Sequence, residues 1–256
     1  MRSLINKIVS NKFSLLLRNT FKIRPVRISK YYSNKNISMS DAFLFRTDNN
    51  FSSILRFVDI PSIFFDYKNT NIEIQFYDFQ NKFLKKDIIH PLKKNNELLI
   101  DKHYLNGAET YGHFFIFHNI KNFDDRKISF SNRCYVGYSK NNNNFSFVHG
   151  NTFVKAKNLN DGSMISDFSH ISLLKNYKYA LQENFSKVDC LEIFICNPTS
   201  HRLKISINGK KNNLARNCDK VFRFNEVKKI EILSNCTNLR PVVFTYKDEF
   251  FDAHHG

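Results

Sequence analysis

Residues 72–78 read Ile72-Glu73-Ile74-Gln75-Phe76-Tyr77-Asp78, an alternation of apolar and polar side chains with a period of two. Such alternation is typical of a β-strand that has one face in the core. Similar apolar segments recur at residues 114–117, 134–138, 145–148, 190–195, 203–207, 229–233 and 242–246. Turn residues such as Asn106-Gly107, Asp161-Gly162 and Asn208-Gly209 separate them. Many short strands with frequent turns predict an all-β fold of antiparallel β-sandwich modules, either jelly-roll or immunoglobulin-like, rather than βαβ units.

Two hairpins in the two halves of the chain resemble each other. Residues 133–150 run from an arginine through a strand, an asparagine turn and an aromatic strand to His-Gly, and residues 240–256 follow the same order. This echo predicts an internal duplication, with a first module at residues 41–155 and a second at residues 156–256. Chance similarity is the alternative, because aromatic hairpins are common in such a composition. Helix is expected in the N-terminal segment, around residues 48–57 and in the connection at residues 167–184.

The first 40 residues form a basic N-terminal segment. They carry nine Lys and Arg side chains and no acid, so the remaining 216 residues hold +7 of the net charge of +16 (16 − 9 = 7). The apolar spacing over residues 3–22 predicts a short amphipathic helix that ends before Arg24-Pro25. We expect this helix to lie on an anionic membrane surface, which would make the protein cytoplasmic and peripheral to the inner face of the membrane. An organellar import sequence and an ordinary helix packed on the body are the alternatives.

The cysteines and the absent motifs exclude several classes of protein. Five cysteines are scattered without the spacing of a zinc site or a disulfide framework, which indicates buried thiols in a reducing compartment. The chain contains no glycine-rich phosphate loop, no HExxH and no GxSxG motif. Nucleic-acid binding ranks last among the functions considered, because it rests only on net charge.

Side chains that recur in the two hairpins predict a ligand-binding face. Arginine and asparagine bind carboxylates or sugar hydroxyls through paired hydrogen bonds, and tyrosine offers a flat face with a polar edge. The candidate ligand-binding residues are Arg133, Tyr138, His149, Asn151, Asn235, Arg240 and Tyr246. The alternative is that these side chains pack against their own hairpins.

Histidines at the hairpin ends form a second candidate site. His149, Asp252, His254 and His255 combine imidazole and carboxylate groups, a ligand set suited to zinc or iron. Neighbouring strand residues point to opposite faces, so Asp252 and His254 share one face while His255 lies on the other. At most a subset could therefore hold one metal ion. The first expectation is that no cofactor is needed, and a zinc or iron site is the alternative.

Several short motifs carry a family resemblance over roughly residues 40–256. They are Asn197-Pro198-Thr199, residues 240–244, residues 251–256, residues 135–138 and His149-Gly150-Asn151. In these motifs the chain resembles uncharacterised bacterial proteins associated with surface-polysaccharide genes. The resemblance implies a sandwich protein that works near glycan assembly, and it implies no established reaction or catalytic residue.

The expected function is therefore a non-catalytic, peripheral membrane protein of cell-envelope polysaccharide assembly. Its expected partners are an anionic membrane surface, contacted through residues 1–40, and a glycan intermediate or another envelope-assembly protein. The alternative is a metal-dependent or acid/base enzyme that acts on a sugar or a polar small molecule at the histidine-rich site between the modules.

Overall fold

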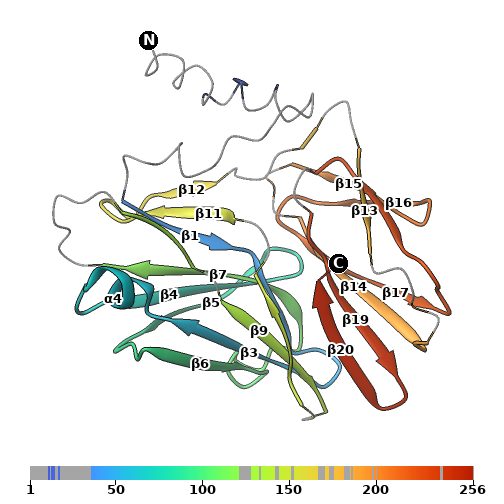
Figure 1. Ribbon diagram of the computed structural model, residues 1–256, viewed down its shortest axis with the longest axis horizontal. Coiled ribbons are helices and arrows are strands. Elements are labelled where there is room, and N and C mark those ends of the chain that lie inside the picture. The colour runs from blue at the N-terminus through green and yellow to red at the C-terminus, as the bar shows by residue number, and fades with distance from the viewer. Residues whose placement is uncertain are drawn as a thin grey trace.

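The computed structural model consists almost entirely of antiparallel β-sheets in the part of the chain that it describes, which confirms the all-β prediction (Figure 1). The described residues are 36–120, 128–132, 134–141, 144–150, 153–166, 171–172, 176–181, 185, 187–197, 199, 201–236 and 239–255, with Asn11, Phe13, Ser14 and Leu17. The amphipathic helix predicted for residues 3–22 therefore lies outside the described residues, apart from those four positions. No helix among the described residues has the length and apolar composition needed to cross a membrane.

The first twelve strands form three four-stranded sheets, which we call the first module. The strands are β1 (Ile37–Asp41), β2 (Phe43–Arg46), β3 (Phe51–Val58), β4 (Asn71–Asp78), β5 (Phe83–Ile89), β6 (Asn95–Ile100), β7 (Tyr111–Asn119), β8 (Ser129–Asn132), β9 (Tyr135–Lys140), β10 (Ser146–His149), β11 (Phe153–Asn158) and β12 (Met164–Ser166). The sheet orders are β12-β11-β1-β8, β2-β7-β4-β5 and β10-β9-β3-β6. Every pair is antiparallel except β1 with β8.

The remaining strands form two further four-stranded sheets, which we call the second module. They are β13 (Tyr177–Ala180), β14 (Cys190–Cys196), β15 (Leu203–Ile207), β16 (Lys210–Leu214), β17 (Asp219–Asn225), β18 (Glu231–Ser234), β19 (Val242–Lys247) and β20 (Phe250–His255). The sheet orders are β13-β18-β15-β16 and β17-β14-β19-β20. Strand β11 spans the predicted boundary at residue 155 and pairs with β1 and β12. The pairing of the first module thus continues to Ser166.

One helix prediction is wrong. Residues 48–57, which we expected to be helical, form a turn followed by β3. Strand β3 pairs with β9 on one side and with β6 on the other, so its backbone donors and acceptors are satisfied by long-range partners. Strand β13 likewise occupies part of the connection at residues 167–184, where a helix was also expected.

The short helix α4 (Ile60–Phe65) follows β3. Asp59 Oδ1 caps its N-terminus by accepting a hydrogen bond from Ser62 N at 3.2 Å.

In the sheet β17-β14-β19-β20, strand β14 and residues 242–244 of β19 are buried on both faces. Along β14, Leu191, Ile193 and Ile195 pack into the core of the second module. The alternate residues Phe194 and Cys196 join the core of the first module instead. In Figure 1 this sheet accordingly lies between the strands of the first module and the outer sheet of the second. The first module therefore covers a face that an isolated sandwich would expose to water.

The two hairpins that resemble each other occupy equivalent places. Strand β10 is the edge of its sheet with β9 next to it, and β20 is the edge of its sheet with β19 next to it. His149 is opposite Tyr135 in the first hairpin, and His255 is opposite Val242 in the second. The two hairpins therefore have the same position in their sheets and the same register of the histidine opposite the first strand.

Candidate functional site

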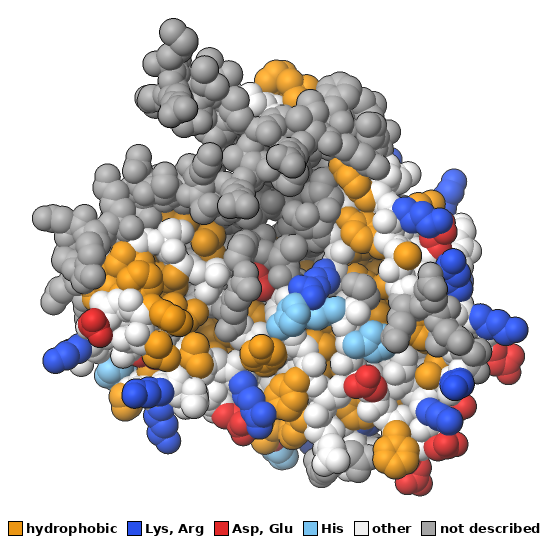
Figure 2. All heavy atoms as spheres, viewed as in Figure 1, with side chains coloured by type: hydrophobic (Ala, Val, Ile, Leu, Met, Phe, Trp, Pro, Cys, Tyr) orange, Lys and Arg blue, Asp and Glu red, His pale blue; other side chains and the backbone are white. Residues whose placement is uncertain are grey.

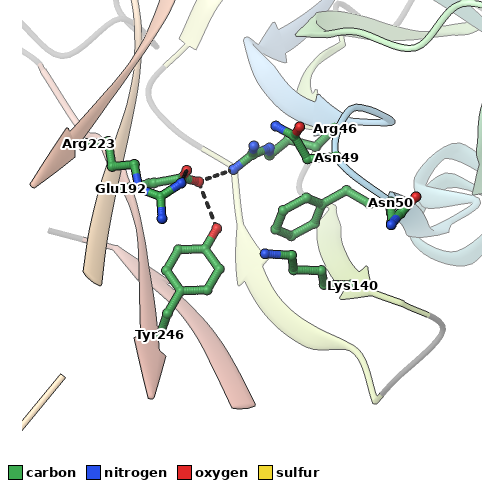
Figure 3. Close-up of a pocket in the computed structure, with 8 residues that line it drawn as sticks. Arg46, Asn49, Asn50, Lys140, Glu192, Arg223 and Tyr246 are labelled. Carbon is green, nitrogen blue, oxygen red and sulfur yellow. Dashed lines mark hydrogen bonds and ion pairs between the residues drawn. The ribbon is translucent and has the colours of Figure 1, made fainter. Parts of the chain in front are cut away.

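A pocket of about 280 Å³ lies between the two modules (Figure 3). Its lining comes from the ends of β2, β3 and β9, the turn between β2 and β3, and strands β14, β17 and β19. The lining residues are Arg46, Asn49, Asn50, Phe51, Lys140, Glu192, Arg223 and Tyr246. Asn49 and Asn50 have φ angles of 49° and 62°, a left-handed turn that asparagine tolerates better than most residues.

Arg46 and Glu192, which both line the pocket, form an ion pair. Arg46 Nη1 lies 2.5 Å from Glu192 Oε2, and Arg46 Nη2 lies 2.7 Å from Asp48 Oδ2. Arg46 is 1% exposed. Burial opposes its charge, but the hydrogen bond and charge of Asp48, together with Glu192, hold the pKa of Arg46 above its usual value. The pair therefore links the modules through a charge that stays on the arginine.

Tyr246 is held by the same carboxylate. Its hydroxyl donates to Glu192 Oε2 at 2.7 Å, as the dashed line in Figure 3 shows. Burial raises the pKa of Tyr246, and the hydrogen bond to Glu192 raises it further. The positive charge of Arg46 acts in the opposite direction but is outweighed. Tyr246 is thus a neutral donor at ordinary pH, and its ring forms one wall of the pocket.

Two further cations border the pocket. Lys140 Nζ lies 4.7 Å from the centre of the Tyr246 ring and 5.6 Å from that of Phe51, and it forms no ion pair with another described residue. Arg223 Nη1 lies 4.0 Å from Glu192 Oε1, and its side chain is 69% exposed. The lining therefore holds three cations and one carboxylate, a net charge of +2, or +1 when Asp48 behind Arg46 is included.

His149, Arg240 and His255 meet at a second place, where β10 and β20 approach each other. The rings of His149 and His255 lie 4.8 Å apart, and Arg240 Nη2 donates to His149 Nε2 at 3.2 Å. His255 Nε2 donates to the backbone oxygen of His149. Figure 2 shows histidine side chains beside a basic side chain near the middle of this face, close to where Figure 1 marks the C-terminus.

These contacts make the histidines part of the junction between the modules. Burial lowers the pKa of His255 to about 4, so this ring is neutral at ordinary pH. Ser146 Oγ also bridges the two strands, since it accepts from Ala253 N at 3.0 Å and lies 2.5 Å from Asp252 Oδ1. Gly150 follows His149 where a Cβ atom would collide with Asp41 and Phe43, which explains the glycine in the His-Gly pair.

The four predicted metal ligands are not brought together. His254 Nδ1 lies 3.9 Å from Asp252 Oδ2, while the ring of His255 contacts His149 instead. Both ring nitrogens of His149 already have partners, since Nε2 accepts from Arg240 Nη2 at 3.2 Å and Nδ1 lies 3.3 Å from Gly150 O. Among the described residues, the group of potential ligand atoms that does converge is that of His113, Cys196 and Asp219.

The predicted ligand-binding residues are also dispersed. Tyr246 lines the pocket, and His149 and Arg240 lie at the β10–β20 junction. Tyr138 is corrected to a core residue, because it is 0% exposed and its hydroxyl donates to Leu44 O at 3.0 Å. Asn235 is buried in the second module, where its Oδ1 accepts from Lys204 N at 2.9 Å. Arg133 and Asn151 lie outside the described residues.

Sequence reasoning missed most of the pocket. Arg46 and Glu192 carried a usable signal, because each is a charged residue inside a strand of otherwise apolar side chains, Phe43-Leu44-Phe45-Arg46 and residues 190–196. A charge in such a place is paired when it is buried. Lys140 and Arg223 carried no such signal. Lys140 is at the polar end of β9, and Arg223 lies in β17, where charged and apolar residues alternate, so a charge is expected at both positions.

The comparisons with known proteins add no family to this description. No protein-family model matches the chain, and no curated protein matches it in sequence. The class that the fold and the pocket define is an all-β protein with a basic pocket between two groups of sheets.

Proposed function

We propose that the protein is a non-catalytic binding protein that holds an acidic sugar unit of a glycan intermediate in the pocket between its modules. The observation that carries this proposal is the convergence of Arg46, Lys140 and Arg223, from both modules, on one cavity. Cationic side chains around a concave site attract an anionic ligand, and arginine binds carboxylate or phosphate through two parallel hydrogen bonds. In the proposed complex Lys140 and Arg223 contact the anionic group.

The size and the walls of the pocket favour a carbohydrate. Its volume of about 280 Å³ is near the lower end of the range of about 300–1,000 Å³ for small-molecule sites, which suits a single sugar unit. Tyr246 offers a flat face and Asn49 and Asn50 offer amide groups, the types of side chain that pack on and hydrogen-bond to sugars. A polar ligand with a negative charge matches this lining better than an apolar one.

The hydrogen bonds that Glu192 already accepts favour a binding function over a catalytic one. Glycoside hydrolysis requires two carboxylates that flank the scissile bond. The pocket lining contains one, Glu192, which already accepts hydrogen bonds from Arg46 and Tyr246. The alternative enzyme would use His149, Asp252, His254 and His255, and these residues are divided between different contacts. The binding function is therefore the one proposed.

The binding test compares charged and neutral sugars. Isothermal titration of the full chain with glucuronate is expected to give heat of binding, and glucose is expected to bind more weakly. Lys140→Ala and Arg223→Ala should each weaken glucuronate binding by about 10- to 100-fold, because each removes a charge-assisted hydrogen bond. Lys220→Ala is the matched control, since it removes an exposed cation from the same strand as Arg223. Equal affinity for the two sugars, or equal losses in all three variants, would contradict the proposal.

We further propose that the protein works at the cytoplasmic face of the membrane in cell-envelope polysaccharide assembly. The support is the acid-free N-terminal segment with its nine basic residues. Anionic lipid attracts a basic side chain near its surface by about 1 kcal/mol. When the N-terminal segment is bound to the membrane, a glycan in the pocket is held close to the membrane surface.

Vesicle flotation tests the attachment. Changing Arg2, Lys7, Lys12 and Arg18 to glutamine in the full chain should remove about 4 kcal/mol of attraction and abolish flotation with phosphatidylserine vesicles. The matched control changes four exposed basic residues of the second module, Lys210, Lys211, Lys228 and Lys229, to glutamine and should keep flotation. If the wild-type chain does not float, or if both variants lose flotation equally, the N-terminal segment is not the attachment site.

A further inference from the structure

His113, Cys196 and Asp219 meet inside the contact between the modules, away from the pocket lining. Their potential ligand atoms, one from each residue, all lie within 4.8 Å of one another. His113 Nδ1 is 2.7 Å from Asp219 Oδ2. The three residues are buried, with exposed fractions of 1%, 7% and 4%. A nitrogen, a sulfur and a carboxylate thus converge at a site screened from water.

Strand pairing explains how the three side chains meet. Cys196 and Asp219 are directly opposite each other in the antiparallel pair of β14 and β17, so both belong to the second module. His113 lies on β7 of the first module, where its ring stacks on Tyr77 with centroids 5.4 Å apart. Asp219 N donates to Phe79 O of the first module at 2.9 Å, which fixes the approach of the two backbones. The cluster therefore joins the modules.

One atom of this cluster has no hydrogen-bond partner among the described residues. Asp219 Oδ1 is buried and unpaired, although Oδ2 of the same carboxylate binds His113. A buried carboxylate oxygen without a partner costs free energy, and such atoms often mark the place of an ion or a water molecule. This free oxygen is a second observation, independent of the convergence, that points to a ligand.

We propose that His113 Nδ1, Cys196 Sγ and Asp219 together bind a Zn²⁺ ion that cross-links the two modules. Imidazole nitrogen, thiolate sulfur and carboxylate oxygen are the protein ligands of zinc, which would take three positions of a tetrahedron here. One thiolate and one carboxylate balance the two charges of the ion, as a buried site requires. Zinc binding releases the thiol proton of Cys196 to water, and the proton between His113 Nδ1 and Asp219 moves to Nε2 of the same imidazole ring.

A zinc site explains the chemistry of the cluster better than a Cys-His-Asp catalytic triad. In a triad the histidine lies between the thiol and the carboxylate, and the thiolate must reach a substrate. Here Cys196 is only 7% exposed and lies directly opposite Asp219 in the pair of β14 and β17, so the thiol and the carboxylate are neighbours and a substrate has no access to the thiol.

The test measures metal bound to the tag-free, full-length protein. We expect about one zinc per chain by elemental analysis after growth with zinc and desalting. Replacement by Co²⁺ should give the intense near-ultraviolet absorption of a thiolate–cobalt bond and the visible bands of tetrahedral cobalt. Added zinc should also raise the melting temperature of the metal-free protein, because it binds only the folded chain.

Variants assign the ligands. Cys196→Ser should remove the thiolate–cobalt absorption, and Asp219→Asn, which keeps the size of the side chain, should lower the zinc content. Cys190→Ser is the matched control, because Cys190 is a buried cysteine at the other end of β14. A wild-type protein without stoichiometric zinc and without thiolate–cobalt absorption overturns the proposal, even if the variants do not fold. Equal loss of absorption in the Cys190 and Cys196 variants overturns it as well.

Discussion

Phe244→Ala should lower the free energy of unfolding by about 3–5 kcal/mol, the cost of a large cavity in a packed core. Phe244 is 0% exposed. It belongs to β19 of the second module, yet its ring lies 5.7 Å from Phe51 and 4.9 Å from Tyr138, both of the first module. Removing it therefore empties space that both modules share. Urea unfolding followed by circular dichroism measures the loss.

The matched control for this substitution is Phe250→Ala in the same hairpin. Phe250 is 80% exposed, so its loss should change the free energy of unfolding by no more than about 0.5 kcal/mol. Because the core cluster of the first module contains Phe194 and Phe244, we also expect one unfolding transition for the two modules. Two separate transitions, of which Phe244→Ala shifts only one, would contradict the shared core.

Arg46→Met should be as costly, at about 3–5 kcal/mol, because it removes the buried cation that pairs with the buried Glu192 and the half-buried Asp48. The side chains of Asp48 and Glu192 are only 17% and 10% exposed, so water can replace the arginine only in part. The guanidinium also lies 4.1 Å from the centre of the Phe51 ring, and that cation–π contact is lost with it. Equilibrium unfolding of the variant gives the magnitude.

Two variants control for the loss of charge. Arg56→Ala removes an arginine whose ion pair with Glu97 is exposed, and it should cost no more than about 1 kcal/mol. The double variant Arg46→Met with Glu192→Gln should recover part of the loss, since it removes one of the unpaired charges. If Arg46→Met and Arg56→Ala cost the same, the Arg46 pair does not hold the modules together.

Local sequence accounts for much of the strand content. The alternation at residues 72–78 and 203–207 predicts strands, which the structure confirms as β4 and β15. The turn at Asn208-Gly209 is confirmed too, since its φ angles of 46° and 80° connect Ile207 to Lys210 in a hairpin. Period-two alternation and the left-handed turn depend on adjacent residues, so a sequence alone can show them.

Residues 48–57 show the limit of local patterns. Phe51, Ile54, Leu55 and Phe57 have spacings that suit either a helix face or a strand with two buried sides. Pairing with β9 and β6 decided for the strand, and the paired residues lie between 37 (95 − 58) and 89 (140 − 51) positions further along the chain. When long-range hydrogen bonds decide between helix and strand, the local sequence does not show which of the two forms.

By itself, the sequence determined the clearly alternating strands such as β4 and β15, the tight turns and the concentration of positive charge in the first 40 residues, because these properties are carried by neighbouring side chains. Only the tertiary structure decided that the first module covers the outer face of β14 and β19. That contact pairs Arg46 with Glu192, 146 positions away, and His113 with Asp219, 106 positions away. The physical reason is that packing of complementary apolar faces sets the position of one sheet on another, and the polar side chains between them meet only as a consequence.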